Sequence, residues 1–169
     1  LGGFRSQAWV DTAQGILFIV VLWGSLLIVA GKNGGWMQSW SRLMETAPEV
    51  LLYHDTTHYW NWRMYLSFFI LQGCGGFLAP YVWQRSYAAK SSFAVKKLAG
   101  LMGIVFCIGV VFPVIFCGLN FHVLMPNMAN PENGLVLFMG QYAPFWGILV
   151  TLGILAAGMS TISSILVTA

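Results

Sequence analysis

The sequence predicts an all-α protein, a polytopic bundle of transmembrane helices, and three observations support this. Hydrophobic residues make up 58% of the chain and charged residues 8%, whereas soluble domains have about 45–50% and about 25%. Several apolar stretches have the length of a membrane span. Eight Trp, six Tyr and twelve Phe suit a protein with wide interfacial belts, where amphipathic rings lie at headgroup depth. We therefore expect a multi-pass integral protein of the plasma or inner membrane, surrounded by the lipid bilayer.

Four stretches reach the roughly 20 apolar residues that a spanning helix needs. They cover about residues 9–30, 65–83, 98–119 and 143–169. The first has Asp11 just inside it, and the third contains Pro113, which we expect to make an ordinary kink. The second and fourth carry features that point to a function.

The loops between these stretches predict an orientation in the membrane. The loop 84–97 holds Arg85, Lys90, Lys96 and Lys97 and no acidic residue. The loop 31–63 mixes both signs of charge, and the loop 120–142 has Glu132 and no Lys or Arg. By the positive-inside rule, 84–97 is cytoplasmic, so the first helix runs from inside to outside and the fourth from outside to inside.

The second stretch contains a run of helix-breaking residues near its middle. Residues 72–80 read Gln-Gly-Cys-Gly-Gly-Phe-Leu-Ala-Pro, and each Gly costs about 1 kcal/mol and Pro about 3 kcal/mol relative to Ala in a helix. A bent or broken helix at this depth exposes backbone groups, from which transporters build substrate sites. The alternative is close helix packing through a face of small residues, including Gly73 and Gly76.

The fourth stretch contains a cluster of hydroxyl residues at helical spacing. Gly153, Ala157, Ser160 and Ser164 form one narrow stripe of small residues. The Ala157 carbonyl can converge with the Ser160 and Thr161 hydroxyls, and three neutral oxygens suit a hard monovalent cation. The alternative is that each hydroxyl donates to the carbonyl four residues earlier, as is usual in membrane helices.

Composition and spacing argue against other classes of function. The net charge of +3 is too small to indicate nucleic-acid binding. Cys74, Cys107 and Cys117 have no CxxC spacing, so we expect small buried apolar side chains. His54 and His58 have the spacing of metal ligands but no third ligand in view, so a solvated or gating loop is favoured. We do not expect an enzyme, because the spans contain no nucleophile with a base.

Three motifs in order resemble the sodium:solute symporter family. Residues 2–15, with Gly-Gly-x-x-x-x-x-Trp-x-Asp-x-x-Gln, resemble the opening of the family's fifth core helix. Residues 80–90 resemble the cytoplasmic Gln-Arg-x-x-Ala-Ala-Lys stretch after the sixth, and residues 155–169 resemble the signature helix. The resemblance covers essentially the whole chain. It implies core helices five to eight of a ten-helix inverted repeat with LeuT-type architecture.

The resemblance also implies functional residues. The family's sodium site falls on the Ala157 carbonyl and on the Ser160 and Thr161 hydroxyls. Its other ligands belong to the first core helix, so this sequence holds half of the site. Asp11 matches a family acid implicated in sodium handling, although a carboxylate at a helix start in the membrane interface is the simpler alternative.

Departures from the family pattern guide the choice of solute. Sugar-transporting relatives carry aromatic residues at the break of the sixth helix, where this chain has Gln72, Gly73, Gly75 and Gly76. We therefore expect an amino acid or small carboxylate rather than a sugar, with these four residues as candidate contacts, because exposed amides suit a carboxylate.

The sequence thus predicts sodium-coupled symport of a small organic solute by alternating access. The expected partners are the solute, Na⁺, the bilayer and the remaining helices of a longer transporter. We expect this piece to be internal, because there is no initiator Met and the last residue lies within an apolar run. Two alternatives stay open: the membrane sensory module of a histidine kinase with the same fold, and a proton-coupled or sodium-independent carrier.

Overall fold

The computed structural model describes residues 3–51, 61–126, 128 and 130–168, and every regular element in these ranges is helical. The predicted all-α fold class is thus confirmed. The α-helices are α1 (Gly3–Lys32), α2 (Trp36–Thr46), α3 (Trp62–Leu78), α4 (Pro80–Tyr87), α5 (Ser92–Phe106), α6 (Phe112–Leu124), α7 (Gly134–Tyr142) and α8 (Pro144–Thr168).

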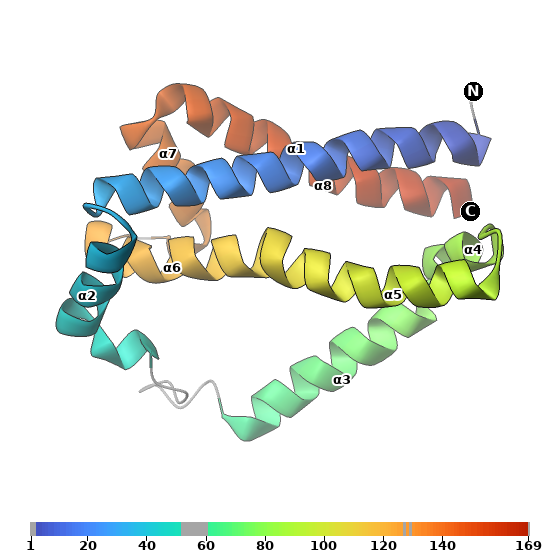
Figure 1. The fold of residues 1–169 in the computed structure, drawn as a ribbon, viewed down its shortest axis with the longest axis horizontal. Coiled ribbons are helices and arrows are strands. Elements are labelled where there is room, and N and C mark those ends of the chain that lie inside the picture. Colours follow the sequence, from blue (N-terminus) through green and yellow to red (C-terminus); the bar gives the residue numbers. More distant parts are fainter. Residues whose placement is uncertain (1–2, 52–60, 127, 129, 169) are drawn as a thin grey trace.

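Three of the described helical segments are long and apolar enough to cross a membrane: Arg5–Lys32, Ser92–Phe121 and Pro144–Leu166. The second of these joins α5 and α6 into one continuous helix. Figure 1 shows the three lying lengthwise beside one another, with both chain termini and the α4–α5 turn at one end of the molecule and α2 and α7 at the other. The helices α1 and α8 are therefore antiparallel.

The stretch that we expected to span the membrane over 65–83 is divided at Ala79. Helix α3 continues through the glycines to Leu78, Ala79 is extended (φ −67°, ψ 119°), and α4 begins at Pro80. Proline disfavours helical geometry in the residue before it and has no N–H for the helix ladder. The break therefore falls at the proline, and the glycine run itself is helical.

The buried core lies at the α2 and α7 end of the bundle. Its members come from α1, α6, α7 and α8: Val21, Leu26, Val29, Ala30, Phe116, Cys117, Phe138, Met139 and Val150. The chain turns sharply between α7 and α8 at Ala143, and a Cβ atom at Gly147 would lie 3.0 Å from the Gly140 nitrogen. Glycine at 147 thus permits α8 to fold back closely on α7.

Two buried asparagines connect α6 to the end of α1. The Asn33 amide donates to Asn120 Oδ1, and Asn120 Nδ2 donates to the Phe116 carbonyl at 2.8 Å. On the same face, the Trp36 ring stacks on Phe116 with centroids 4.4 Å apart. These contacts join α1, α2 and α6 at this end.

The helix formed by α5 and α6 contains a π-helical turn, Cys107–Val111, directly before Pro113. The Phe112 N–H bonds to the Cys107 carbonyl, five residues earlier. The predicted kink at Pro113 thus lies next to a wider turn, and both a proline and a π turn are known causes of a bend in a helix. The prediction of buried cysteines is right for Cys117 and wrong for Cys74 and Cys107, which are exposed.

Candidate functional site

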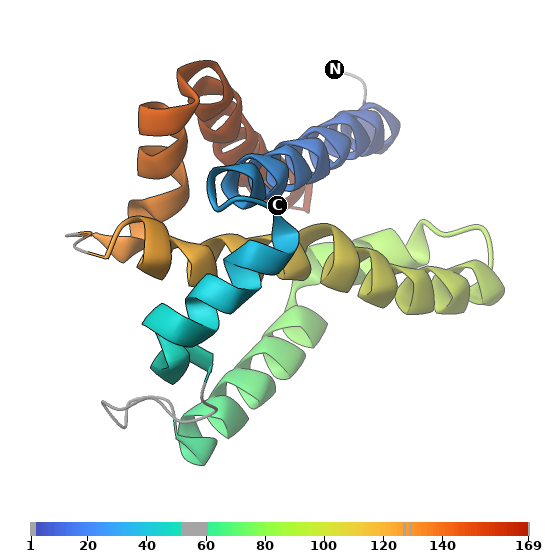
Figure 2. The same cartoon turned by 60° about the vertical axis from the view of Figure 1, so that its left-hand side comes forward.

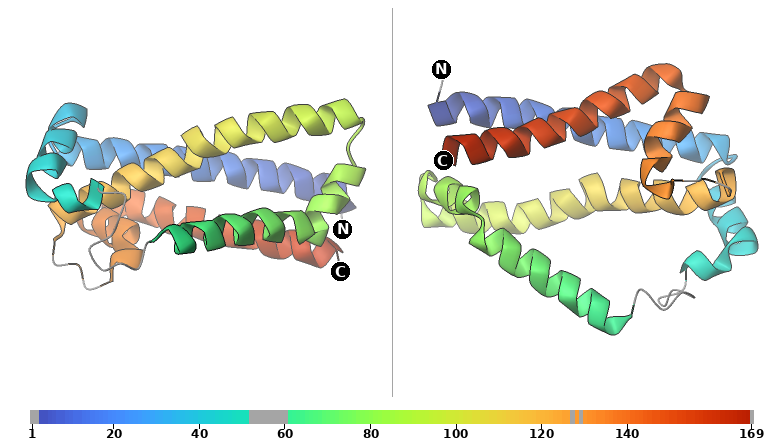
Figure 3. Two further views of the ribbon diagram at one scale, coloured as in Figure 1. Left: turned by 90° about the horizontal axis from the view of Figure 1, so that it is seen from below. Right: turned by 180° about the vertical axis from the view of Figure 1, so that it is seen from behind.

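A group of polar residues lies between α1 and α8, near the two chain termini. Gln7, Asp11 and Gln14 recur at i, i+4 and i+7 and so share one face of α1. The small-residue stripe of α8 allows the two helices to approach: a Cβ atom at Gly153 would lie 3.6 Å from Val21 on α1. The helices run side by side over this length (Figure 3).

The central contact of this interface joins Ser160 to Asp11. The Ser160 hydroxyl donates to Asp11 Oδ1 at 2.8 Å, in a partly buried position. The two residues are 149 positions apart in the sequence and come from the two motifs that suggested sodium handling. Because the Ser160 O–H donates this hydrogen bond, the lone pairs of Oγ are not used by Asp11 and remain able to contact a cation.

The other hydroxyls of the cluster bond within α8. Thr161 Oγ1 donates to the Ala157 carbonyl at 3.2 Å, Ser163 to the Ser160 carbonyl at 3.0 Å, and Ser164 to the same carbonyl at 2.8 Å. The alternative of a bond to the carbonyl four residues earlier therefore holds for Thr161 and Ser164, whereas Ser163 bonds to the carbonyl three residues earlier and Ser160 bonds to Asp11. The predicted ligand oxygens of Ala157 and Thr161 are next to each other.

Two glutamines belong to this interface, although we did not predict them as site residues. Gln7 Nε2 donates to Ser164 Oγ at 3.1 Å. Within the described part of the chain, Gln7 Oε1 and Gln14 Oε1 are buried and accept no hydrogen bond. A buried acceptor without a donor costs free energy. The two amide oxygens on either side of Asp11 are therefore available to bind a donor or a cation. Their spacing around Asp11 was a signal that could have identified them.

The interface thus presents hard oxygen atoms of four kinds. Asp11 contributes a carboxylate, Gln7 and Gln14 contribute amide oxygens, and α8 contributes hydroxyl and carbonyl oxygens. Such ligands favour hard cations over soft ones. One carboxylate balances one charge, which fits a monovalent ion. No group of three or more His, Cys, Asp or Glu that could hold a metal occurs among the described residues.

The candidate solute contacts on α3 lie apart from this interface. Gln72, Gly73, Gly75 and Gly76 are exposed, and a Cβ atom at any of these glycines would have nothing within 4 Å. Figure 3 shows α3 diverging from α5 and α6, while α4 lies beside α8. The alternative of close helix packing through these glycines is not seen in the described structure. His54 and His58 lie outside the described residues.

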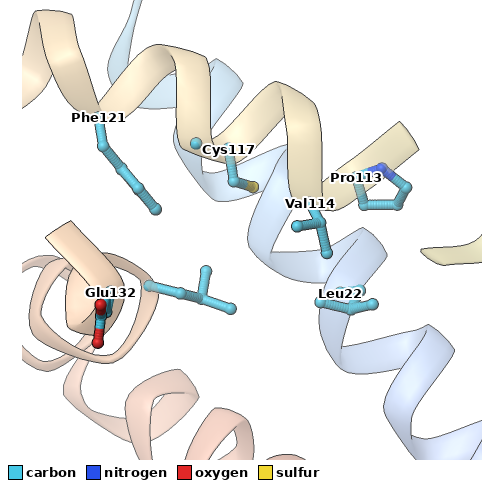
Figure 4. A pocket seen from close by; sticks show the side chains of 8 residues that line it. Leu22, Pro113, Val114, Cys117, Phe121 and Glu132 are labelled. Atoms are coloured by element: carbon cyan, nitrogen blue, oxygen red, sulfur yellow. The ribbon is translucent and has the colours of Figure 1, made fainter. Parts of the chain in front are cut away.

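A cavity of about 170 Å³ lies near the opposite end (Figure 4), between α1, α6, α7 and the short helix Pro131–Asn133. Its lining is mostly apolar, including Leu22, Cys117 and Phe121, and Glu132 is its charged member. None of the residues that the sequence singled out for sodium or solute lines it.

Comparison with curated proteins and with solved structures found no match. The model of the sodium:solute symporter family matches residues 1–169, the whole chain. This match confirms the resemblance that the three motifs indicated. The chain belongs to the sodium:solute symporter family.

Proposed function

We propose that this chain is part of a sodium-coupled symporter for a small organic solute that works by alternating access. It would supply core helices five to eight of a LeuT-type arrangement, with residues 84–97 on the cytoplasmic side. The observation that supports the proposal most directly is the 2.8 Å hydrogen bond from Ser160 to Asp11. It brings the acid of one family motif against a hydroxyl of another.

In this proposal the α8 wall of the sodium site consists of the Ala157 carbonyl, Ser160 and Thr161. Ala157 O and Thr161 Oγ1 are 3.2 Å apart, a separation that suits two oxygens bound to one small cation at about 2.3–2.6 Å each. The Asp11 carboxylate orients the Ser160 hydroxyl and makes the potential around it more negative. The remaining ligands would come from the first core helix.

Asp11 would have a second role on the sodium pathway. It lies on the α1 face toward α8, between Gln7 and Gln14, whose amide oxygens are buried without donors. A cation that leaves Ala157, Ser160 and Thr161 for this end of the bundle therefore meets further oxygens. Its inward movement releases about 2.3 kcal/mol per charge per 100 mV, and this energy drives solute uptake.

The solute would bind near the break between α3 and α4. Ala79 is extended at this point, and the preceding glycines carry no side chains over the backbone. The backbone N–H groups at the start of α4 have no partner within the helix and favour a carboxylate group. An amino acid or small carboxylate is therefore the proposed solute, with Gln72, Gly73, Gly75 and Gly76 near the end of α3 as further contacts. Sodium and solute would raise each other's affinity through reciprocal coupling.

Binding of radioactive sodium to the purified full-length protein tests the sodium site. We expect Ser160→Ala and Thr161→Ala each to raise the sodium concentration at half-saturation about tenfold, as for the loss of roughly 1.4 kcal/mol. Thr151→Ala is the matched control, because Thr151 Oγ1 makes the same kind of bond on α8, to the Gly147 carbonyl at 3.0 Å. An unchanged half-saturation in both site variants would contradict the proposal.

Asp11 also favours a specific alternative, proton coupling, because a carboxylate between helices can carry a proton. Uptake of labelled amino acids and carboxylates in sodium-free buffer at several pH values distinguishes the two. Sodium coupling predicts no accumulation without sodium at any pH. Accumulation that follows an inward proton gradient in sodium-free buffer would establish the proton carrier instead, and sodium binding without any uptake would support the sensory module.

A further inference from the structure

A basic surface lies at the turn between α4 and α5, at the end of the long helices shown in Figures 1 and 2. Lys90, Lys96 and Lys97 are all exposed there. The sequence from 84 to 97 contains no acidic residue. The turn therefore presents concentrated positive charge at one end of the membrane-length helix.

Aromatic and aliphatic side chains continue from this charge along α5. Tyr87 and Phe93 are 81% and 74% exposed, beside the lysines in sequence. Phe93, Lys97, Leu101, Ile104 and Ile108 recur at helical spacing and share one face. The three aliphatic members are 53–60% exposed, and α5 has no buried residue. An amphipathic stripe thus runs from the lysines toward the middle of the helix.

We propose that this stripe binds an anionic phospholipid of the leaflet at this end of the helices. Lys90, Lys96 and Lys97 would contact the headgroup phosphate, and an acyl chain would lie over Leu101, Ile104 and Ile108. Tyr87 and Phe93 would lie at the boundary between the two, where aromatic rings are favoured. This binding is independent of sodium coupling.

Charge and shape together select this occupant. Basic residues beside a membrane span attract anionic lipids, and each lysine raises the affinity for them about fivefold. The distance from Lys97 to Ile108 is 11 residues, or roughly 16 Å of helix at about 1.5 Å per residue, which is about half the hydrocarbon thickness of a bilayer. The stripe therefore has the length of one leaflet, and a free phosphate would use only its basic end.

Thermal unfolding of the full-length protein in detergent, with added lipid, tests the proposal. We expect phosphatidylglycerol to raise the unfolding midpoint of the unmodified protein more than phosphatidylcholine does. Lys96→Gln with Lys97→Gln should remove most of this difference, an affinity loss of roughly 25-fold for two lysines. Lys96→Arg with Lys97→Arg should keep it. Native mass spectrometry should show fewer bound phosphatidylglycerol molecules in the glutamine variant.

Two controls separate this surface from a general effect of charge. Lys32→Gln with Arg42→Gln removes the same number of charges at the opposite end and should leave the lipid-dependent shift unchanged. Glycerol phosphate, which lacks acyl chains, should give no shift. Equal shifts with both lipids, a full shift in the Lys96 and Lys97 glutamine variant, or a shift with glycerol phosphate equal to that with phosphatidylglycerol would each overturn the proposal.

Discussion

The Trp146 ring lies directly over Gly24, in the space that a side chain at position 24 would occupy. Its indole N–H donates to Ser25 Oγ at 3.1 Å, so α8 is held to α1 by packing and by a hydrogen bond across 121 positions of sequence. The Ser160 contact with Asp11 joins the same helices nearer the chain termini. The two helices are thus connected at both ends of their contact.

This packing predicts that Gly24→Ala lowers the unfolding midpoint of the full-length protein in detergent. A methyl group at position 24 collides with the Trp146 ring, and overpacking of this kind costs about 1–3 kcal/mol. Gly153→Ala is the matched control on α8, since its Cβ atom would lie at an ordinary 3.6 Å from Val21. Equal midpoints for the two variants would show that the ring moves aside without cost.

The asparagine pair predicts a non-additive result. Asn120→Leu leaves the buried Asn33 amide without its acceptor and should cost about 1–3 kcal/mol. Changing both Asn33 and Asn120 to Leu removes both partners and should cost less than the sum of the single changes. A double-mutant cycle of unfolding free energies measures this. Additive effects would mean that the bond contributes nothing to stability.

For Asp11, charge and geometry can be separated. Asp11→Asn keeps an oxygen that can accept the Ser160 proton but removes the negative charge, so we expect weaker sodium binding, by about tenfold or more, with an unchanged unfolding midpoint. Thr12→Ala is the neighbouring control, because its hydroxyl bonds to the Ala8 carbonyl on the exposed side. Unaltered sodium affinity in Asp11→Asn would remove the carboxylate from the proposed pathway.

The glycines of α3 predict a loss of transport without a loss of stability. Gly73→Ala, Gly75→Ala and Gly76→Ala each place a methyl group where the described structure has nothing within 4 Å. Alanine also favours a helix by about 1 kcal/mol over glycine, so the midpoint should not fall. If the solute contacts this backbone, its half-saturation for uptake should rise severalfold. Unchanged uptake in all three variants would place the solute elsewhere.

The sequence predicted some parts of this molecule well and others poorly, for physical reasons. Composition is enough to predict the membrane helices, because the bilayer requires long apolar segments. The motifs singled out Asp11 and Ser160 separately, but a contact across 149 positions depends on tertiary packing. We expected the helix to break within the glycine run, but α3 stays helical to Leu78 and ends directly before Pro80. The proline thus sets the position of the break, because each glycine costs a helix less than a proline does. We predicted that Cys74 and Cys107 are buried, but both are exposed. They lie on apolar helix faces that no other described residues cover.

The π-helical turn before Pro113 has a consequence for evolution. A π turn contains one residue more than the α-helical turn that it replaces. The α-helical segments on either side of it therefore keep the same faces toward their neighbours. Loss of one residue from Cys107–Val111 can be absorbed by a return to α geometry. Loss of a residue near Cys117 would instead rotate the C-terminal part of α6 by about 100° and turn Asn120 away from Asn33. Single-residue deletions in this helix should therefore be tolerated at 107–111 and selected against elsewhere.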